Sequence, residues 1–219
     1  MSRQRRHFLL ATLAGGLALG SGASTLLPAS PGRRVVIVGG GWGGLSAARA
    51  LRQLAPELEV VLLEPHTVFW SNPLSNKWLV GLRDERLLVH DIAAAARAFG
   101  YTHLPVAVSA IDREQRRVVT AGGSLGYDWL ILATGIGHDY GAWFGGDREA
   151  AAYTRQHFPA AFTGRDEAVA LKAKLERFVG GDLVMTIPPM PYRCPPAPYE
   201  RAALIAGLLK GRGSKGRLH

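Results

Sequence analysis

The chain has 219 residues, 47% of them hydrophobic, and a formal net charge of +9. The hydrophobic content is ample for a packed core, and the length allows one large domain or roughly one and a half typical ones. The basic residues are scattered apart from the two ends, and the basic tail at 210–217 has no interleaved aromatic residues. We therefore expect no nucleic-acid binding.

Residues 1–30 match the pattern of a twin-arginine export signal. Arg5 and Arg6 precede an apolar run to Leu27, and small residues gather at 23–30, where we expect cleavage. An uncleaved membrane anchor is the alternative, because the run is nearly long enough to span a bilayer; the glycines in the run favour cleavage. These features predict a periplasmic protein with no stable membrane insertion, in a compartment where disulfides persist.

A glycine-rich turn follows the first expected strand, which runs from Arg34 to Gly39 and is rich in β-branched residues. The turn satisfies the G-x-G-x-x-G pattern and opens a small-residue helix at 43–54. In the dinucleotide-binding fingerprint the first glycine permits a tight turn, the second lets the backbone approach a pyrophosphate, and the third lets the helix pack closely on the sheet. The N–H groups of the helix N-terminus attract phosphates, whereas an ordinary glycine-rich turn is the alternative. The predicted cofactor contacts at this turn are Gly39, Gly41, Trp42, Gly43 and Gly44.

The second expected strand, Glu59 to Leu63, is followed directly by an acidic residue, Glu64. A carboxylate at this position accepts hydrogen bonds from the hydroxyl groups of a ribose. The strand–helix–strand unit therefore predicts binding of an ADP moiety, and it fits FAD and NAD equally well.

Residues 66–81 show no clean periodicity and predict a long loop or a short helix. The aromatic residues in this segment, Phe69, Trp70 and Trp78, either wall a flavin or pack in the core. An alanine-rich helix is expected at 90–99.

Three further strands are expected at 102–111, 116–120 and 124–127, separated by short turns. Strands and turns of these lengths predict a small antiparallel meander inserted between parallel strands. The apolar segment at 127–135 then returns to the parallel sheet.

That returning strand ends in Ala133, Thr134 and Gly135. The ending resembles the Ala-Thr-Gly motif of flavoproteins with two dinucleotide-binding domains, in which the end of the strand packs near FAD. The resemblance favours FAD over NAD at the first fingerprint and adds these three residues to the predicted cofactor contacts.

Residues 139–163 are expected to form a connecting region, and the next helix carries an apolar stripe that includes Leu171 and Leu175. A buried strand at 182–187 and a helix at 198–210 then begin a second βα unit.

These elements together predict an α/β fold. We expect a Rossmann-like FAD-binding domain with a parallel sheet and an inserted antiparallel meander at 31–163, after the signal at 1–30. The start of a second, incomplete dinucleotide-binding-like domain is expected at 164–219.

The link between the last expected strand and helix, at 188–200, contains several prolines and no glycine. Prolines fix φ and remove N–H donors, so this loop is not expected to wrap a pyrophosphate, and NAD(P)H is not expected as the electron donor. The loop carries the one cysteine of the sequence, Cys194. The following helix N-terminus and Arg193 are expected to lower the pKa of its thiol, which favours reactivity; an inert structural cysteine is the alternative.

Glu200 lies in the first turn of the same expected helix. It either accepts a proton during chemistry or simply compensates the helix dipole. Cys194 and Glu200 are our predicted catalytic residues, and the sequence singles out no metal site.

From Arg34 to about Lys210 the chain resembles the flavoprotein subunit of flavocytochrome c sulfide dehydrogenase, a family grouped with the sulfide:quinone oxidoreductases. The motifs that carry the resemblance are Val-Gly-Gly-Gly-x-Gly-Gly at 38–44, Leu-Ser-Asn at 74–76, Val-Thr-Ala-Gly-Gly at 119–123 and Tyr-Arg-Cys-Pro-Pro-x-Pro-Tyr-Glu-Arg at 192–201. The last motif is the most specific of them.

The resemblance implies oxidation of sulfide, or another small sulfur compound, at a redox-active disulfide beside FAD, with electrons passed to a c-type cytochrome subunit. Cys194 matches one half of that disulfide, and Glu200 matches a glutamate proposed as the acid/base. The family's covalent flavin cysteine corresponds to Asn72 here, so we expect FAD to bind non-covalently, with Asn72 beside it.

A second departure is the length of the chain. The family's other disulfide cysteine and its cytochrome-docking C-terminal domain are not in this sequence, and one cysteine cannot form an internal disulfide. We therefore expect an N-terminal fragment of such a flavoprotein. A truncated, non-catalytic FAD-binding remnant is one alternative. A sulfide:quinone oxidoreductase-like enzyme is another, disfavoured because no amphipathic membrane-binding helix is evident.

Overall fold

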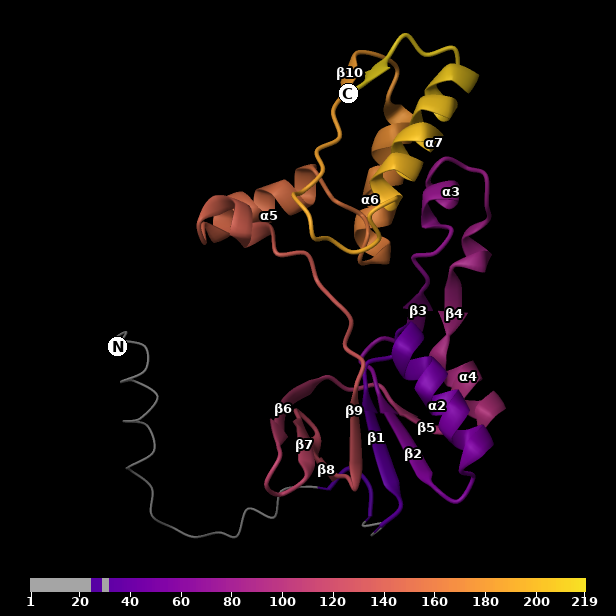
Figure 1. Cartoon of the computed structure of the whole chain (residues 1–219), viewed down its shortest axis with the longest axis vertical. Helices are drawn as coiled ribbons and strands as arrows, with labels where there is room; N and C mark the ends of the chain where they lie inside the picture. Colours follow the sequence, from indigo (N-terminus) through magenta and orange to yellow (C-terminus); the bar gives the residue numbers. More distant parts are fainter. Residues whose placement is uncertain (1–24, 29–31) are drawn as a thin grey trace.

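The computed structural model describes residues 25–28 and 32–219. Its lower part in Figure 1 contains a four-stranded parallel sheet with the strand order β5-β2-β1-β9. The strands are β1 (Arg34–Val38), β2 (Glu59–Leu63), β5 (Thr102–Leu104) and β9 (Trp129–Leu132). The expected first and second strands and the returning apolar strand are thus confirmed, all parallel to one another.

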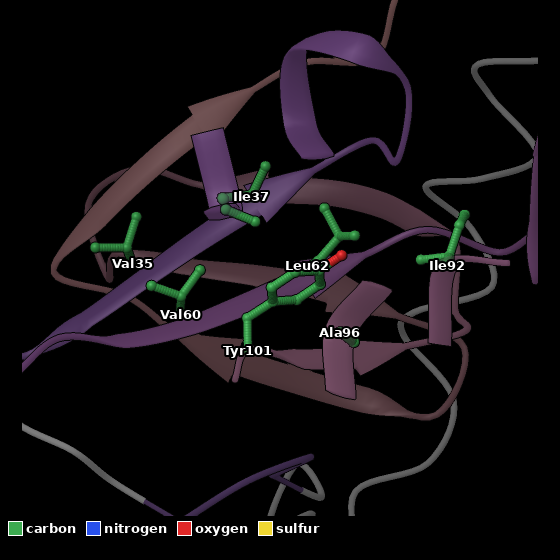
Figure 2. Close-up of a cluster of buried hydrophobic side chains, with 8 residues drawn as sticks. Val35, Ile37, Val60, Leu62, Ile92, Ala96 and Tyr101 are labelled. Carbon is green, nitrogen blue, oxygen red and sulfur yellow. The ribbon is translucent and has the colours of Figure 1, made fainter. Parts of the chain in front are cut away.

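Successive residues of a strand point to opposite faces of a sheet, so each strand contributes side chains to both faces. The two faces of this sheet are covered by different elements. Helices α2 (Trp42–Leu54) and α4 (Ile92–Phe99) lie on one face (Figure 1). Figure 2 shows the core on this side, where odd-numbered β1 residues and even-numbered β2 residues meet α4. The buried members of this cluster are Val35, Ile37, Ala48, Val60, Leu62, Ile92, Ala96 and Tyr101.

The opposite face packs against an antiparallel meander of β6 (Val108–Asp112), β7 (Arg117–Thr120) and β8 (Gly123–Gly126). Val36 and Val61 from the sheet are buried with residues of the meander in this second cluster. The expected inserted meander is therefore confirmed.

The single strand expected at 102–111 is wrong. Thr102–Leu104 pairs with β2 in the parallel sheet, whereas the meander strand begins only at Val108. Pro105 follows Leu104 directly and offers no N–H group, so the strand ends there and the chain crosses to the other sheet.

The upper part of the molecule is built around α6 (Arg165–Arg177) and α7 (Ala197–Gly211), with the short α3 (Ser75–Leu79) beside them (Figure 1). An antiparallel ribbon of β3 (Val68–Trp70) and β4 (Val89–Asp91), with η1 (Glu85–Leu87) before β4, connects α3 to the lower part. The core here contains Trp78, Leu79, Leu88, Ala161, Ala168, Leu175, Ile205 and Leu209. Residues on both sides of the expected domain boundary at 163 thus share one core, and that boundary stays a prediction.

Two expectations in the second half of the chain need correction. The connecting region expected at 139–163 contains the 3-10 helix η2 (Tyr140–Phe144) and helix α5 (Arg148–His157), whose caps are Asp139 and Asp147. The buried strand expected at 182–187 is only β10 (Asp182–Leu183), and Val184 beyond it is 68% exposed.

The second βα unit nevertheless forms. Strand β10 pairs in parallel with β11 (Arg217–Leu218), and α7 is the crossover helix between them. The structure therefore bears out the predicted α/β fold. None of the described helices is long and apolar enough to cross a membrane. The expected twin-arginine pair, at 5 and 6, lies outside the described residues.

Candidate functional site

The glycine turn lies at the carboxyl end of β1, where it is pressed against the end of β9. Gly39 has φ +105, and a Cβ on it would lie 2.3 Å from the carbonyl oxygen of Ala133. A Cβ on Gly44 would lie 1.8 Å from the carbonyl oxygen of Gly39. These two positions therefore require glycine for the fold itself, one for the turn and one for the close approach of α2.

Gly41 and Gly43 lie in more open surroundings. The nearest atom to a Cβ on Gly41 is a ring carbon of Phe69 at 4.0 Å, and a Cβ on Gly43 would meet the Ala133 side chain at 3.6 Å. Gly41 is the N-cap of α2, which has no side-chain cap and no acidic residue in its first turn. The first N–H groups of α2 are thus available to an anion, and the space beside Gly41 is left for one.

Trp42 is 57% exposed, and its ring and that of Phe69 are perpendicular to each other, with 5.6 Å between centroids. Phe69 in turn stacks on His90. Trp70 and Trp78 pack against each other, and Trp78 is buried in the upper core. Of the loop aromatics, Phe69 lies beside the glycine turn, whereas Trp78 serves packing.

Glu64 lies directly after β2, and its carboxylate is already oriented by the backbone. Oε2 accepts a hydrogen bond from Gly40 N at 2.7 Å, and Oε1 accepts one from His66 N at 3.0 Å and contacts His66 Nδ1 at 2.6 Å. Partial burial alone would raise the pKa of Glu64, but the hydrogen bonds from His66 and Gly40 outweigh burial and hold that pKa below its ordinary value. The carboxylate is therefore ionised and fixed at the turn, as binding to ribose hydroxyls requires.

Gly40 is a residue of this site that the spacing of the fingerprint did not single out. A Cβ at this position would lie 2.6 Å from Cγ of Glu64. Glycine is needed here for the carboxylate to approach the turn, and the unbroken run of three glycines was the signal in the sequence.

The end of β9 brings Ala133 and Thr134 against Gly39, because Ala133 N donates to Val38 O at 2.8 Å and continues the strand pairing past Leu132. Gly135 follows with φ +71 and is exposed. The glycine turn, Glu64 and the Ala-Thr-Gly ending thus meet at one edge of the sheet.

Asn72 lies between β3 and α3. Its Oδ1 atom is buried and has no hydrogen-bond partner among the described residues. A buried amide oxygen without a partner is costly, so this position suits a ligand that brings a hydrogen-bond donor.

Cys194 lies in the proline-rich loop before α7. It is exposed and has φ +57, a left-handed conformation that non-glycine residues seldom adopt. Its carbonyl oxygen accepts a hydrogen bond from Ala197 N at 2.9 Å, so the cysteine is tied to the first turn of the helix. Strained residues cluster at functional sites, which agrees with a chemical role for this thiol.

Glu200 lies on the first turn of α7, and its carboxylate is turned toward α3. Asn76 Nδ2 donates to Glu200 Oε2 at 2.8 Å, and Arg201 Nε donates to Asn76 Oδ1 at 2.9 Å. Burial lowers the pKa of Arg201 to about 10, and Glu200 opposes that shift. Asn76 and Arg201 were not predicted as site residues, although both stand in the motifs at 74–76 and 192–201.

A buried carboxylate, that of Glu167, organises the segment before α6. Its oxygens accept hydrogen bonds from Tyr140 Oη at 3.1 Å, Arg155 Nε at 3.0 Å and Ala161 N at 3.0 Å. His138 lies nearby, and burial lowers its pKa against the opposing charge of Glu167. An open hollow of about 640 Å³ lies over this segment.

The predicted site residues fall into two groups. The cofactor residues around the glycine turn lie at the edge of the lower sheet, whereas Glu200 lies on the first turn of α7, an upper-part helix in Figure 1, and contacts Asn76 of α3. Cys194 lies in the loop directly before α7. The segment from Phe69 to Asn76 connects the two groups, since Phe69 approaches Gly41 and Asn76 contacts Glu200. No group of three or more possible metal-ligating side chains occurs within 25–28 and 32–219.

Comparison with known proteins agrees with this layout. A family model for pyridine nucleotide-disulphide oxidoreductases matches residues 33–158, more than half of the chain. The chain belongs to this family. A model of the central region of the flavoprotein chain of sulfide dehydrogenase (flavocytochrome c) matches residues 168–218 of the chain.

Individual relatives of the chain include two that are named for sulfide. The sulfide-quinone reductase of Aquifex aeolicus is 26% identical over 183 residues, which are 83% of this chain and 40% of the relative. The sulfide dehydrogenase (flavocytochrome c) flavoprotein chain of Chlorobaculum thiosulfatiphilum is 54% identical over 44 residues, which are 20% of this chain and 92% of that sequence.

The solved structure of the sulfide:quinone oxidoreductase from Aquifex aeolicus superposes with a TM-score of 0.71 and 25% identity, covering 85% of this chain and 42% of that one. A putidaredoxin reductase–putidaredoxin complex superposes with a TM-score of 0.62 at 22% identity, covering 86% of this chain and 42% of that one, and so shares the fold. The chain thus spans about two fifths of the length of the Aquifex protein. The resemblance to the sulfide dehydrogenase flavoprotein family is confirmed.

Proposed function

We propose that the chain is an FAD-dependent oxidoreductase of the sulfide dehydrogenase (flavocytochrome c) type, which oxidises sulfide with Cys194 and passes the electrons to a c-type cytochrome. The observation that carries the proposal is the exposed Cys194 at the start of α7, within the segment that matches the sulfide dehydrogenase flavoprotein model. The glycine turn at the edge of the parallel sheet supplies the dinucleotide site that such an enzyme needs.

The residues of the turn fit the ADP half of FAD. The open space beside Gly41, the uncapped N-terminus of α2 and the oriented carboxylate of Glu64 are suited to the pyrophosphate and the ribose. The end of β9, at Ala133 to Gly135, completes the wall of the site. FAD, when bound, supplies an acceptor for two electrons.

We propose that the FAD is held non-covalently. Asn72 carries an amide where the related flavoproteins carry a cysteine, and an amide forms no thioether. Its buried Oδ1 lacks a partner among the described residues, which supports contact with a hydrogen-bond donor of the cofactor.

Cys194 is the residue whose thiol sulfur forms a bond with the sulfur atom of sulfide. Formation of a sulfur–sulfur bond between its thiol and HS⁻ gives a persulfide anion and releases two protons and two electrons; FAD, when bound, would take up both electrons and one of the protons. The thiol is exposed, so HS⁻ reaches it directly. Glu200, on the first turn of α7, which follows the Cys194 loop, is the carboxylate that accepts the other proton.

The electron acceptor and the compartment are part of the same proposal. A c-type cytochrome subunit receives the electrons, and the twin-arginine segment at the N-terminus exports the folded chain to the periplasm. Replacement of Arg5 and Arg6 by lysine tests the second statement, because the chain is then expected to be retained in the cytoplasm.

The deciding experiment uses the purified chain. We expect visible flavin absorbance at one FAD per chain, bleaching on anaerobic addition of sulfide, and reduction of added cytochrome c. Cys194→Ser is expected to retain the flavin and to lose the bleaching. Met190→Leu, an exposed change in the same loop, is the matched control and is expected to behave as the native chain does.

A quinone acceptor is the second candidate, because the Aquifex sulfide-quinone reductase aligns with 83% of the chain. Replacing cytochrome c by a soluble ubiquinone analogue in the same assay separates the two acceptors. A flavin that is bound but not bleached by sulfide would instead identify a non-catalytic FAD-binding protein.

A further inference from the structure

We propose that Asn76 is a positioning residue: buried Arg201 fixes the orientation of its amide, and that amide holds the carboxylate of Glu200 at the start of α7. The inference rests on the proposed function for its catalytic meaning, because Glu200 is the proton acceptor of that proposal. The hydrogen bond from the oriented amide to Glu200 does not depend on that function and has its own measurement.

Arg201 is a fixed cation. Its side chain is 4% exposed, and Nη1 and Nη2 donate to the carbonyl oxygens of Ala160 and Ala161 at 2.6 and 2.8 Å. The guanidinium carbon lies 3.5 Å from the centre of the Phe162 ring. With these contacts made, Nε is directed at Asn76 Oδ1.

The orientation of the Asn76 amide follows from what its neighbours can donate. A guanidinium group has only donors, and an ionised carboxylate has only acceptors. A flipped amide would place its NH₂ group against Arg201 and its oxygen against Glu200, and both contacts would be repulsive. The observed orientation, with Oδ1 at Arg201 and Nδ2 at Glu200, is therefore the one that satisfies every group.

The surrounding backbone is strained in a way that supports a dedicated arrangement. Leu74, Ala161 and Cys194 all have positive φ values, at 72, 54 and 57. Leu74 caps α3 two residues before Asn76, and Ala161 accepts the hydrogen bond from Arg201. Left-handed non-glycine residues persist where their surroundings determine them, and two of them, Leu74 and Ala161, adjoin the partners of the Asn76–Arg201 hydrogen bond.

Asn76 connects two parts of the proposed site through its hydrogen bonds to Arg201 and Glu200. Asn76 follows Asn72 by four residues, on the segment that leads from Phe69, beside the glycine turn, to α3. Glu200 follows Cys194 by six residues, at the start of α7. The amide therefore joins the cofactor-side segment to the segment with the reactive thiol. We infer that it sets the position of Glu200 during proton transfer.

The first test does not depend on catalysis. Asn72 and Asn76 are the two asparagines of the sequence, so labelling the full chain with ¹⁵N-asparagine gives two side-chain amide signals, with Asn72 as the internal control. We expect the Asn76 signal to move as Glu200 is protonated on lowering the pH, and this movement to be absent in Glu200→Gln. The same movement in native chain and Glu200→Gln would overturn the proposed hydrogen bond.

The second test addresses the role in proton transfer. Asn76→Asp keeps an acceptor for Arg201 but replaces the donor to Glu200 by a like charge. We expect flavin content and melting temperature to be retained, the rate of flavin reduction by sulfide to fall at least tenfold, and its pH profile to shift to higher pH. Lys77→Gln, on the same helix, is expected to leave the rate and the profile unchanged.

The two tests separate the two proposals. If sulfide does not reduce the flavin of the native chain, the proposed function fails, and the NMR titration alone decides whether Asn76 holds Glu200. If sulfide reduces the flavin and Asn76→Asp reacts at the native rate with the native pH profile, the positioning role is overturned.

Discussion

A side-chain carbon on Gly39 would lie 2.3 Å from the carbonyl oxygen of Ala133. The turn after β1 and the end of β9 are therefore in direct backbone contact, although 94 positions separate the two residues (133 − 39). Two motifs that are far apart in the sequence thus form a single wall, and the contact depends on the absence of a Cβ at Gly39.

Gly39→Ala is expected to destabilise the fold. Its φ of +105 disfavours an L side chain, and the new methyl group would overlap Ala133, so we expect a loss of about 2 kcal/mol or more in the free energy of unfolding. Urea denaturation of the chain without cofactor measures it. Gly207→Ala in α7 is the control, because a Cβ there meets nothing within 4 Å, and it is expected to be neutral or to stabilise by about 0.5–1 kcal/mol. Equal stability of the two variants would contradict the contact with Ala133.

Gly41→Ala is expected to have the opposite pattern. The nearest neighbour of a Cβ there is Phe69 at 4.0 Å, so the chain without cofactor should keep its stability. The methyl group would occupy the space that the pyrophosphate of FAD needs, and we expect the dissociation constant for FAD to rise at least tenfold. Titration of the chain with FAD, followed by flavin fluorescence, measures it, and unchanged affinity would contradict the assignment of Gly41 to the cofactor.

The parallel sheet and its glycine turn are predictable from the sequence because their determinants are local. Side chains of β1 and β2 point alternately to the two faces of the sheet, so residue parity decides which of them face α2 and α4 and which face the meander. A G-x-G-x-x-G pattern directly after a strand indicates a dinucleotide-binding turn. The sequence does not predict the division of the 102–111 segment at Pro105, because a proline inside an apolar run marks a break without indicating which sheet each half joins.

The network around Glu200 is not predictable in this way. Arg201 and Asn76 are 125 positions apart, and their hydrogen bond exists only because α3 packs beside α7. A local pattern identifies Glu200 as a first-turn acidic residue of a helix, which has an ordinary explanation in the helix dipole. The contact with Asn76 is what gives the carboxylate a specific position.

Cys194 provides a prediction that needs no sulfide. As the one cysteine of the sequence, and an exposed one, it should react with a thiol reagent such as DTNB to one equivalent per native chain, without denaturant. Alkylation with iodoacetamide should leave flavin content unchanged and abolish reduction of the flavin by sulfide. Full sulfide activity after complete alkylation would remove the thiol from the proposed reaction.

Glu64 gives a prediction for the dependence of stability on pH. Hydrogen bonds from His66 and Gly40 hold the pKa of Glu64 below its ordinary value in the folded chain, despite the opposing effect of burial. A carboxyl group of this kind contributes stability that is present above its unfolded pKa of about 4.3 and is lost as the pH falls through the lower folded value. Glu64→Gln should therefore melt at a lower temperature than the native chain at about pH 7, and the difference should shrink below about pH 4.

The control for this series is Glu57→Gln, which changes an exposed carboxylate at the other end of β2. We expect its melting temperature to follow that of the native chain across the same pH range. A constant difference between Glu64→Gln and the native chain from neutral to acidic pH would show that the loss arises from altered packing at Gly40 rather than from the charge of Glu64. A difference that closes on acidification, with FAD affinity reduced in the same variant, would connect the ionised carboxylate both to the stability of the turn and to the cofactor that it is proposed to bind.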